Sequence, residues 1–248
     1  MSAYGAFAQL YDALMDDFDY PAWADYYLKL LARAGVRPRT LCDCACGTGS
    51  LTVQFARAGI RVTGVDLSGE MLEVAAQKAR TNGVQAMFVR QDMCDLKLPR
   101  PVDALVCGCD GVNYLLGEER LRSFFRRARE AIRPGGALAF DISSAYKLEH
   151  VLGDGFFGEE REDMAYLWAN RWDARRRTVT MDLTFFKREE SGLYRRFDET
   201  HVQRAHDPGE LAQILKDCGF RPAGVFGDCT FEAPGREELR IHLLAVRE

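Results

Sequence analysis

The sequence has no net positive charge and no long hydrophobic run, and these two absences exclude broad classes of protein. No apolar stretch approaches the roughly 20 residues that a membrane-spanning helix needs, so we expect no contact with a membrane. The 37 acidic residues outnumber the 33 lysines and arginines, which gives a net charge of −4. The overall basic field that favours non-specific binding to nucleic acid is therefore missing.

Two sequence signals are also absent, a secretory leader and a C-x-x-C pair. The first twenty residues are acidic and carry no basic n-region, which predicts a cytoplasmic protein with reduced thiols. Cysteines spaced as Cys42, Cys44 and Cys46 lie roughly 7 Å apart along a strand, too far to share a zinc ion. We expect no metal site and read the eight cysteines as small buried hydrophobic residues, with a redox-sensitive cluster as the alternative.

What the sequence does contain is an alternation of short apolar runs and amphipathic segments. Strands are predicted at 41–45, 60–66, 84–92, 102–109, 137–142, 224–231 and 239–246, with helices at 21–35, 50–58, 68–82, 118–132 and 207–218. This rhythm indicates an α/β fold with a doubly wound, mostly parallel, seven-stranded sheet. One domain is expected over residues 1–248. The arginines of 118–132 are assigned to a solvated helix face.

Between residues 164 and 205 the apolar period changes to two. In TVTMDLTFF (178–186), Val179, Met181, Leu183 and Phe185 alternate with polar residues. With 164–172 and 193–205 on either side, this predicts an antiparallel three-stranded meander inserted after strand five. We expect the insertion to form a cap over a binding pocket.

The stretch LCDCACGTGSL (41–51) joins the first strand to a helix through a glycine turn, an arrangement that suits a nucleotide. No Gly-Lys-Ser/Thr follows, so the loop is not a P-loop. The third glycine of a dinucleotide fingerprint is replaced by Thr52. A smaller ligand than a dinucleotide is therefore favoured.

The loop pattern D-x-A-C-G-T-G resembles the first motif of class I S-adenosylmethionine (SAM)-dependent methyltransferases, with Ala45 where many members carry glycine. Further motifs follow in the family's order: an aspartate after strand two, Gln-Asp-Met after strand three, Cys-Asp after strand four, and RPGG before strand five. The resemblance implies a Rossmann-like fold with SAM as cofactor. It implies cofactor contacts from Tyr11, Asp43, Ala45, Cys46, Gly47, Gly49, Asp66, Leu67, Asp92, Met93 and Cys109.

Two of these carboxylates have specific expected partners. A carboxylate at Asp66 can accept hydrogen bonds from both ribose hydroxyls, and the resemblance directs Asp92 to the adenine. The alternative for Asp66 is a structural role at the helix start near Ser68. The alternative for Asp92 is a carboxylate that stabilises a turn.

The chain also resembles small-molecule methyltransferases such as glycine N-methyltransferase and the amino-sugar N,N-dimethyltransferases. In those enzymes a β-rich insertion covers the active site and an N-terminal segment with tyrosines closes over the cofactor. Tyr4, Tyr11 and Trp23 lie in the corresponding segment here, and Tyr11 is the best candidate for a contact. The expected catalytic candidates are Tyr11, Asp110, Asn113, Tyr114 and His201.

The sequence of the turn after strand four indicates which kind of methyl acceptor to expect. It reads CGCDGVNYL, without the (Asp/Asn/Ser)-Pro-Pro-(Tyr/Phe) of base-amine methylases or the Pro-Cys of cytosine C5 enzymes. We therefore expect a small-molecule acceptor, an amine or hydroxyl compound, and no DNA. The alternatives are an RNA methyltransferase and a SAM-binding regulatory protein without turnover. A homodimer is left open.

Overall fold

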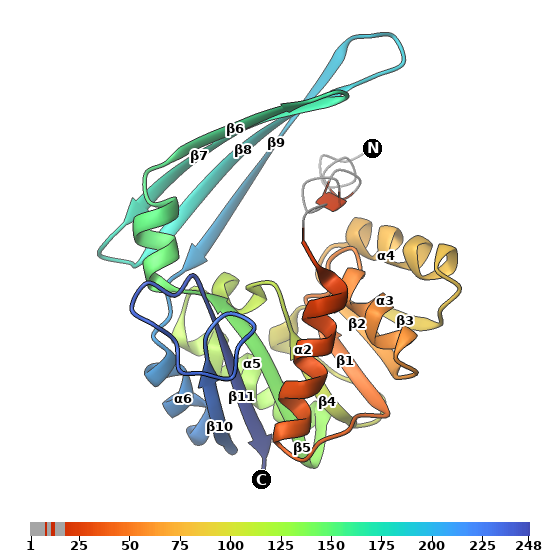
Figure 1. Cartoon of the computed structure of the whole chain (residues 1–248), viewed down its shortest axis with the longest axis vertical. Helices are drawn as coiled ribbons and strands as arrows, with labels where there is room; N and C mark the ends of the chain where they lie inside the picture. Colours follow the sequence, from red (N-terminus) through yellow and green to blue (C-terminus); the bar gives the residue numbers. More distant parts are fainter. Residues whose placement is uncertain (1–7, 9–10, 13–17) are drawn as a thin grey trace.

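The computed structural model describes residues 8, 11–12 and 18–248. Its main layer is a seven-stranded sheet in the order β10-β11-β5-β4-β1-β2-β3, in which all strands are parallel except the antiparallel β11 (Figure 1). The strands are β1 Thr40–Cys44, β2 Arg61–Asp66, β3 Ala86–Arg90, β4 Val102–Cys107, β5 Ile132–Ser143, β10 Phe220–Phe226 and β11 Arg240–Arg247. The predicted doubly wound sheet is confirmed.

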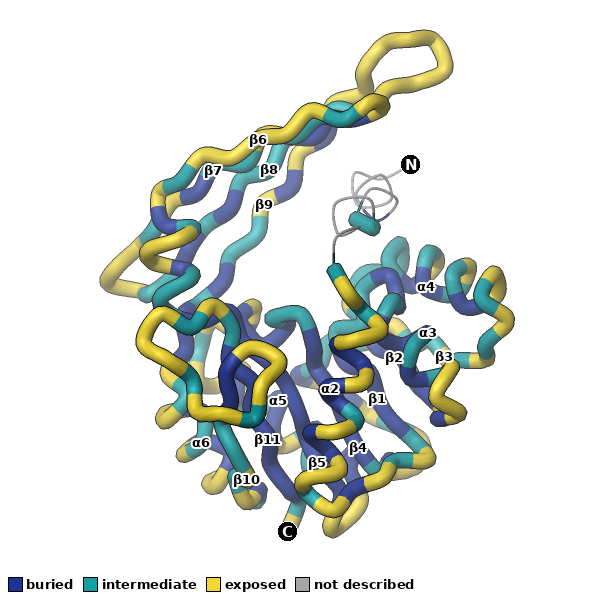
Figure 2. The backbone as a smooth tube through the Cα atoms, viewed as in Figure 1, coloured by how far each residue is buried: buried dark blue, intermediate teal, exposed yellow. Residues whose placement is uncertain are grey.

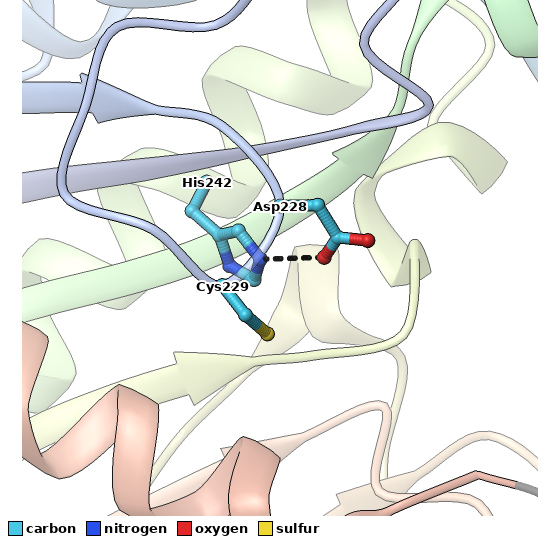
Figure 3. Close-up of side chains that lie close together, drawn as sticks. All are labelled: Asp228, Cys229 and His242. Atoms are coloured by element: carbon cyan, nitrogen blue, oxygen red, sulfur yellow. Dashed lines mark ion pairs between the residues drawn. The ribbon is translucent and has the colours of Figure 1, made fainter.

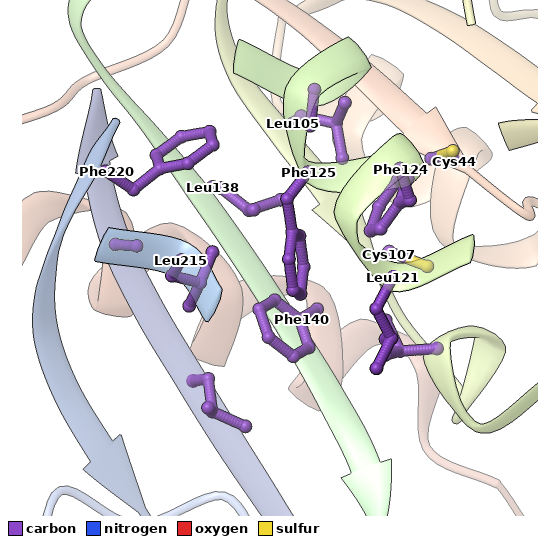
Figure 4. Close-up of a cluster of buried hydrophobic side chains, with 14 of the residues drawn as sticks. Cys44, Leu105, Cys107, Leu121, Phe124, Phe125, Leu138, Phe140, Leu215 and Phe220 are labelled. Carbon is purple, nitrogen blue, oxygen red and sulfur yellow. The ribbon is translucent and has the colours of Figure 1, made fainter. Parts of the chain in front are cut away.

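Helices cover both faces of this sheet and bury its central strands. They are α2 Tyr20–Arg33, α3 Ser50–Arg57, α4 Gly69–Thr81, α5 Glu118–Ala131 and α6 Pro208–Asp217, with 3-10 turns η1 Met93–Asp95 and η2 Gly111–Tyr114. One core cluster joins the sheet to α5 and α6, with Phe124, Phe125 and Phe140 at its centre (Figure 4). A second cluster on the opposite face joins the sheet to α2 and α3.

Local capping explains why the helices begin where the sequence predicts. The Ser68 hydroxyl accepts a hydrogen bond from the Met71 N–H, and Asp207 accepts from the backbone two and three residues on. Each cap satisfies amides that the first helical turn leaves unpaired. Two strand starts were wrong. β10 was expected at 224–231, but the chain re-enters the sheet at Phe220, directly after the Gly219 turn, and β5 was expected at 137–142 but begins at Ile132.

A second sheet rises above the carboxyl ends of the parallel strands (Figure 1). It is reached through η3, Lys147–Leu152, and consists of β6 Phe156–Arg161, β7 Met164–Asp173, β8 Thr178–Arg188 and β9 Tyr194–Arg204, all antiparallel. We call residues 156–204 the cap sheet. Three strands were predicted and four are present. The edge strand β6 was missed because it is almost wholly exposed and lacks an apolar alternation (Figure 2).

Among the described residues, no helix is both long and apolar enough to cross a membrane. Tyr4 lies outside the described residues. Trp23 is a buried core residue that packs on Phe18, Tyr27 and His242, so its role is structural.

Candidate active site

A cavity of about 950 Å³ lies between the carboxyl edge of the main sheet and the cap sheet. Loops after β1, β2, β3 and β4 form its floor, and side chains of β7, β8 and β9 form its roof. This volume is at the upper end of the range for ligand pockets. It accommodates a cofactor together with a second small molecule.

The glycine turn after β1 shapes one wall of the cavity. Ala45, Gly47 and Gly49 have φ of 56°, 53° and 75°, all left-handed. A Cβ at Gly49 would lie 2.8 Å from the Cβ of Ala75, so this position requires glycine. Ala45, Cys46 and Gly47 line the cavity, whereas Gly49 acts behind them by fixing the turn.

Asp66, at the end of β2, holds the glycine turn and faces the cavity. One carboxylate oxygen accepts the Gly47 N–H at 2.8 Å, and the other accepts the Ser68 N–H at 2.9 Å. The hydrogen bond from Ser68 shows that Asp66 also supports the start of α4, which is the alternative role considered from the sequence. Each oxygen keeps a further lone pair for a ligand hydroxyl, and the neighbouring Leu67 offers an apolar surface that is 63% exposed.

Asp92 lines the same cavity with a partner that sequence reasoning missed. Its oxygens accept from Arg120 Nη2 at 3.0 and 2.8 Å, and one also accepts the Cys94 N–H at 2.8 Å. Partial burial acts to raise the pKa of Asp92, but the Arg120 guanidinium and the Cys94 amide hold that pKa below its usual value. Arg120 lines the cavity through this ion pair, while 53% of its side chain remains exposed, as expected for the solvated face of its helix. Met93 lies beside it in the cavity wall.

Asp43 is a buried carboxyl at the base of the cavity. Its oxygen accepts a hydrogen bond from the Thr52 hydroxyl. Desolvation is the main cause that raises the pKa of Asp43 to about 7. A cationic ligand placed nearby would favour the ionised form.

Seven of the eight cysteines lie in the core or at the cavity wall, whereas Cys229 is exposed, contrary to the expectation that all eight are buried. Cys42, Cys44 and Cys107 lie in the hydrophobic core, while Cys46 and Cys109 line the cavity. Burial raises the pKa of the Cys42, Cys46 and Cys109 thiols, which keeps them protonated and weakly nucleophilic. Cys44 and Cys107 are close enough that hydrogen bonding between them raises the pKa of Cys107.

Asp110 connects the floor of the cavity to its roof. Cys109 and Asp110 both have a left-handed φ, 54° and 55°, which is strained backbone of the kind found at functional sites. The Asp110 carboxylate accepts from Gln203 Nε2 on β9 at 2.9 Å and from the Ser143 hydroxyl at 3.1 Å. Its N–H donates to Asp141, which also binds Arg240.

Two of the candidates named from the sequence, Tyr114 and His201, meet across the cavity. The Tyr114 hydroxyl lies 3.2 Å from His201 Nδ1. Burial lowers the pKa of His201, so its imidazole is neutral at physiological pH. Tyr11 also lines the cavity, packed near Phe185 of the cap sheet, and burial raises its pKa.

Asn113 does not belong to the cavity. Its Oδ1 accepts the Ser143 N–H at 2.9 Å, and its Nδ2 donates to the carbonyls of Ser143 and Arg204 at 3.0 and 2.9 Å. The side chain is buried and its hydrogen-bonding capacity is used within the fold. Its role is therefore to join η2 to β5 and β9.

Other cavity residues were not expected from the sequence. The additional polar ones include Glu70, Lys147, Gln203 and Arg240. The signal for Gln203 was present, because Phe197, His201 and Gln203 share one face of an alternating strand. Arg240 carried no comparable pattern, because its place in the cavity is set by the pairing of β11 with β5. Lys147 lies just beyond the end of β5, in η3.

Comparisons with known proteins agree with this arrangement. A model of the methyltransferase domain matches residues 41–136. A protein of Geobacillus sp. (strain WCH70) named as a methyltransferase is 36% identical over 245 residues, covering 98% of this chain and 99% of its own. An N,N-dimethyltransferase of dTDP-4-amino-2,3,4,6-tetradeoxy-D-glucose from Saccharopolyspora spinosa is 27% identical, covering 86% of this chain and 85% of its own.

A solved structure resembles the whole chain. The SAM-dependent methyltransferase from Clostridium acetobutylicum superposes with a TM-score of 0.89 at 31% identity, covering 98% of each chain. The cavity also fits SAM chemically: Asp66 offers acceptors for ribose hydroxyls, and Asp43 offers negative charge for a cationic sulfonium. The chain belongs to the SAM-dependent methyltransferases and takes SAM as its cofactor.

Proposed function

We propose that the enzyme methylates an amine or hydroxyl of a small molecule that binds beneath the cap sheet. The observation that carries this proposal is the continuity of the cavity, which joins the residues after β1 and β2 to the inner face of the cap sheet. An acceptor in the upper part lies next to the methyl donor in the lower part.

The roof of the cavity favours an acceptor with an apolar body. Its lining side chains are Tyr166, Trp168, Met181, Leu183 and Phe185. These side chains exclude water, and alignment of two reactants in a dry site supplies much of the acceleration in a displacement at carbon. The polar groups near this roof are few and fixed, as expected for a site that orients one functional group.

SAM, when bound, supplies a methyl group activated by a positively charged sulfur. The acceptor nitrogen or oxygen forms the new bond to that carbon as the carbon–sulfur bond breaks, and the acceptor loses one proton. His201 is the side chain we assign to receive this proton, because its imidazole is neutral and lies at the cavity wall. Tyr114 holds the ring through its hydroxyl, and Asp110 provides a carboxylate near the acceptor.

The similarity to an amino-sugar N,N-dimethyltransferase supports an amine as acceptor. The acidic net charge and the cap above the cavity give no support to an RNA substrate. A regulatory protein without turnover would have no need of the Tyr114–His201 pair beside the cofactor residues.

The test is to incubate the enzyme with methyl-labelled SAM and three acceptor pools: bulk DNA, bulk RNA and a small-molecule extract. We expect label in the small-molecule pool, a large decrease for His201→Gln, and unchanged SAM affinity in that variant. Asp198→Asn, on the exposed cap surface, is the matched control. Label in DNA or RNA, or turnover unaffected by His201→Gln, would contradict the proposal.

A further inference from the structure

Three potential metal ligands meet outside the catalytic cavity. Asp228 and Cys229 lie in the loop after β10, and His242 lies in β11 (Figure 3). Their ligand atoms all lie within 4.8 Å of one another. Two donors bonded to one four-coordinate zinc ion lie about 3.3–3.8 Å apart, given tetrahedral angles and metal–ligand distances of about 2.0–2.3 Å. Small rotations of the exposed Asp228 and Cys229 side chains are therefore enough to bring the set together.

His242 is the rigid member of this group. Its side chain is fully buried, and the rings of Trp23, Tyr26 and Tyr27 lie 5.3, 4.7 and 5.6 Å from its own. Within the described part of the chain neither ring nitrogen makes a hydrogen bond, and Nε2 points towards Asp228 Oδ1 at 3.6 Å (Figure 3). Burying a ring nitrogen without a hydrogen bond is unfavourable. A cation beside Nε2 would give this nitrogen a partner.

The backbone of the group is also specialised. Cys229 has a φ of 50°, in the left-handed region, although it is not a glycine. Strained backbone of this kind persists where the surrounding structure imposes it and is frequent at ligand sites. The loop is anchored next to Cys229, because the Tyr26 hydroxyl donates to the Thr230 carbonyl at 2.6 Å.

We propose that Asp228, Cys229 and His242 bind a divalent transition-metal ion of the zinc type, with water completing a four-coordinate site. One imidazole nitrogen, one thiolate and one carboxylate form a donor set that suits zinc and excludes magnesium and calcium, which prefer oxygen ligands alone. An ionised Asp228 and a Cys229 thiolate together balance the charge of the cation. The ion would fasten the 227–239 loop to β11.

Binding should release a proton and depend on pH. A coordinated thiol loses its proton, so affinity rises with pH. The other charged groups that face Asp228 and Cys229 are Asp141, Lys147 and Arg240, and the charge of Arg240 is balanced by its ion pair with Asp141.

The test uses metal-free full-length protein under reducing conditions, titrated with Co²⁺ as a spectroscopic substitute for zinc. We expect one ion per chain, a thiolate-to-cobalt charge-transfer band, visible bands of four-coordinate cobalt, and displacement by Zn²⁺. Cys229→Ser should remove the charge-transfer band and Asp228→Asn should weaken binding at least tenfold. Both side chains are exposed, so these variants are expected to fold, and Cys218→Ala is the cysteine control outside the site.

Zinc should also raise the Tm of the wild type and of Cys218→Ala but not that of Cys229→Ser. Absence of a charge-transfer band in the wild type, or its persistence in Cys229→Ser, would refute the site and identify any bound cobalt as adventitious. None of these readouts uses methyl transfer, so the result is independent of the proposed acceptor.

Discussion

Replacing Asp66 by alanine tests the cofactor site most directly. The carboxylate accepts the Gly47 and Ser68 amides at 2.8 and 2.9 Å, which leaves one further lone pair on each oxygen directed to the ligand. Hydrogen bonds to a charged group contribute about 1.5–3 kcal/mol. At about 1.4 kcal/mol per tenfold change, we expect the Kd for SAM to rise about 10- to 150-fold.

Asp66→Asn should lose nearly as much affinity, although it is almost the same size. Its amide nitrogen would face a backbone N–H, at either Gly47 or Ser68, where the carboxylate presents an oxygen. The assay is titration calorimetry with SAM, accompanied by a thermal melt to confirm folding. Asp95→Ala, an exposed carboxylate on the same edge of the sheet, should bind normally. Unchanged affinity in a folded Asp66→Ala variant would refute the assignment.

Three further predictions concern strain, pH and the cap sheet. Ala45→Gly should stabilise the protein by about 0.5–1 kcal/mol in denaturant titrations. The substitution removes about 1–2 kcal/mol of left-handed strain, and the greater backbone entropy of glycine in the unfolded state offsets about 0.5–1 kcal/mol of that gain. A destabilised variant would contradict this. Burial lowers the pKa of His206 to about 4, so between the unfolded value of about 6.5 and pH 4 the unfolded state binds more protons. The free energy of unfolding therefore decreases as the pH falls through this range, by at most about 3 kcal/mol. His206→Gln should flatten that dependence, and identical slopes would disprove it. Replacing residues 156–204 by a short linker should preserve SAM binding in calorimetry and abolish transfer, whereas loss of SAM binding in a folded core would assign the cap sheet to the cofactor site.

Much of the fold could be predicted because its signals are local. Each such signal depends only on residues a few positions away in the sequence. Examples are the glycine turn after β1, the cap at Ser68 and the break after α5. Strand β6 could not be predicted in this way, because an exposed edge strand has no buried face to impose an alternation. The start of β10 was missed because strand length after Gly219 is set by pairing with β11.

The candidate site was predictable where residues follow strand ends and less so elsewhere. Asp66 and Asp92 were found because parallel strands bring their carboxyl ends to one edge. Asn113 was misjudged because its side-chain direction depends on β5 and β9, which are distant in the sequence. Arg120 was missed because a long side chain can reach around the end of its helix. The grouping of Cys229 with His242 arises only when β11 pairs beside β10.

The position of β11 also affects the order in which the molecule can fold. β11 lies between β5 and β10 in the main sheet, and Arg240 pairs with Ser143 across the whole length of the inserted cap sheet. Closing so long a loop is entropically costly, so this pairing is expected late on the folding pathway. Until β11 pairs with β5, the edge of β5 that includes Phe140 and Ile142 stays open. Unpaired strand edges of this kind recruit other chains. Nascent chains that have not yet released β11 from the ribosome are therefore the species most exposed to aggregation.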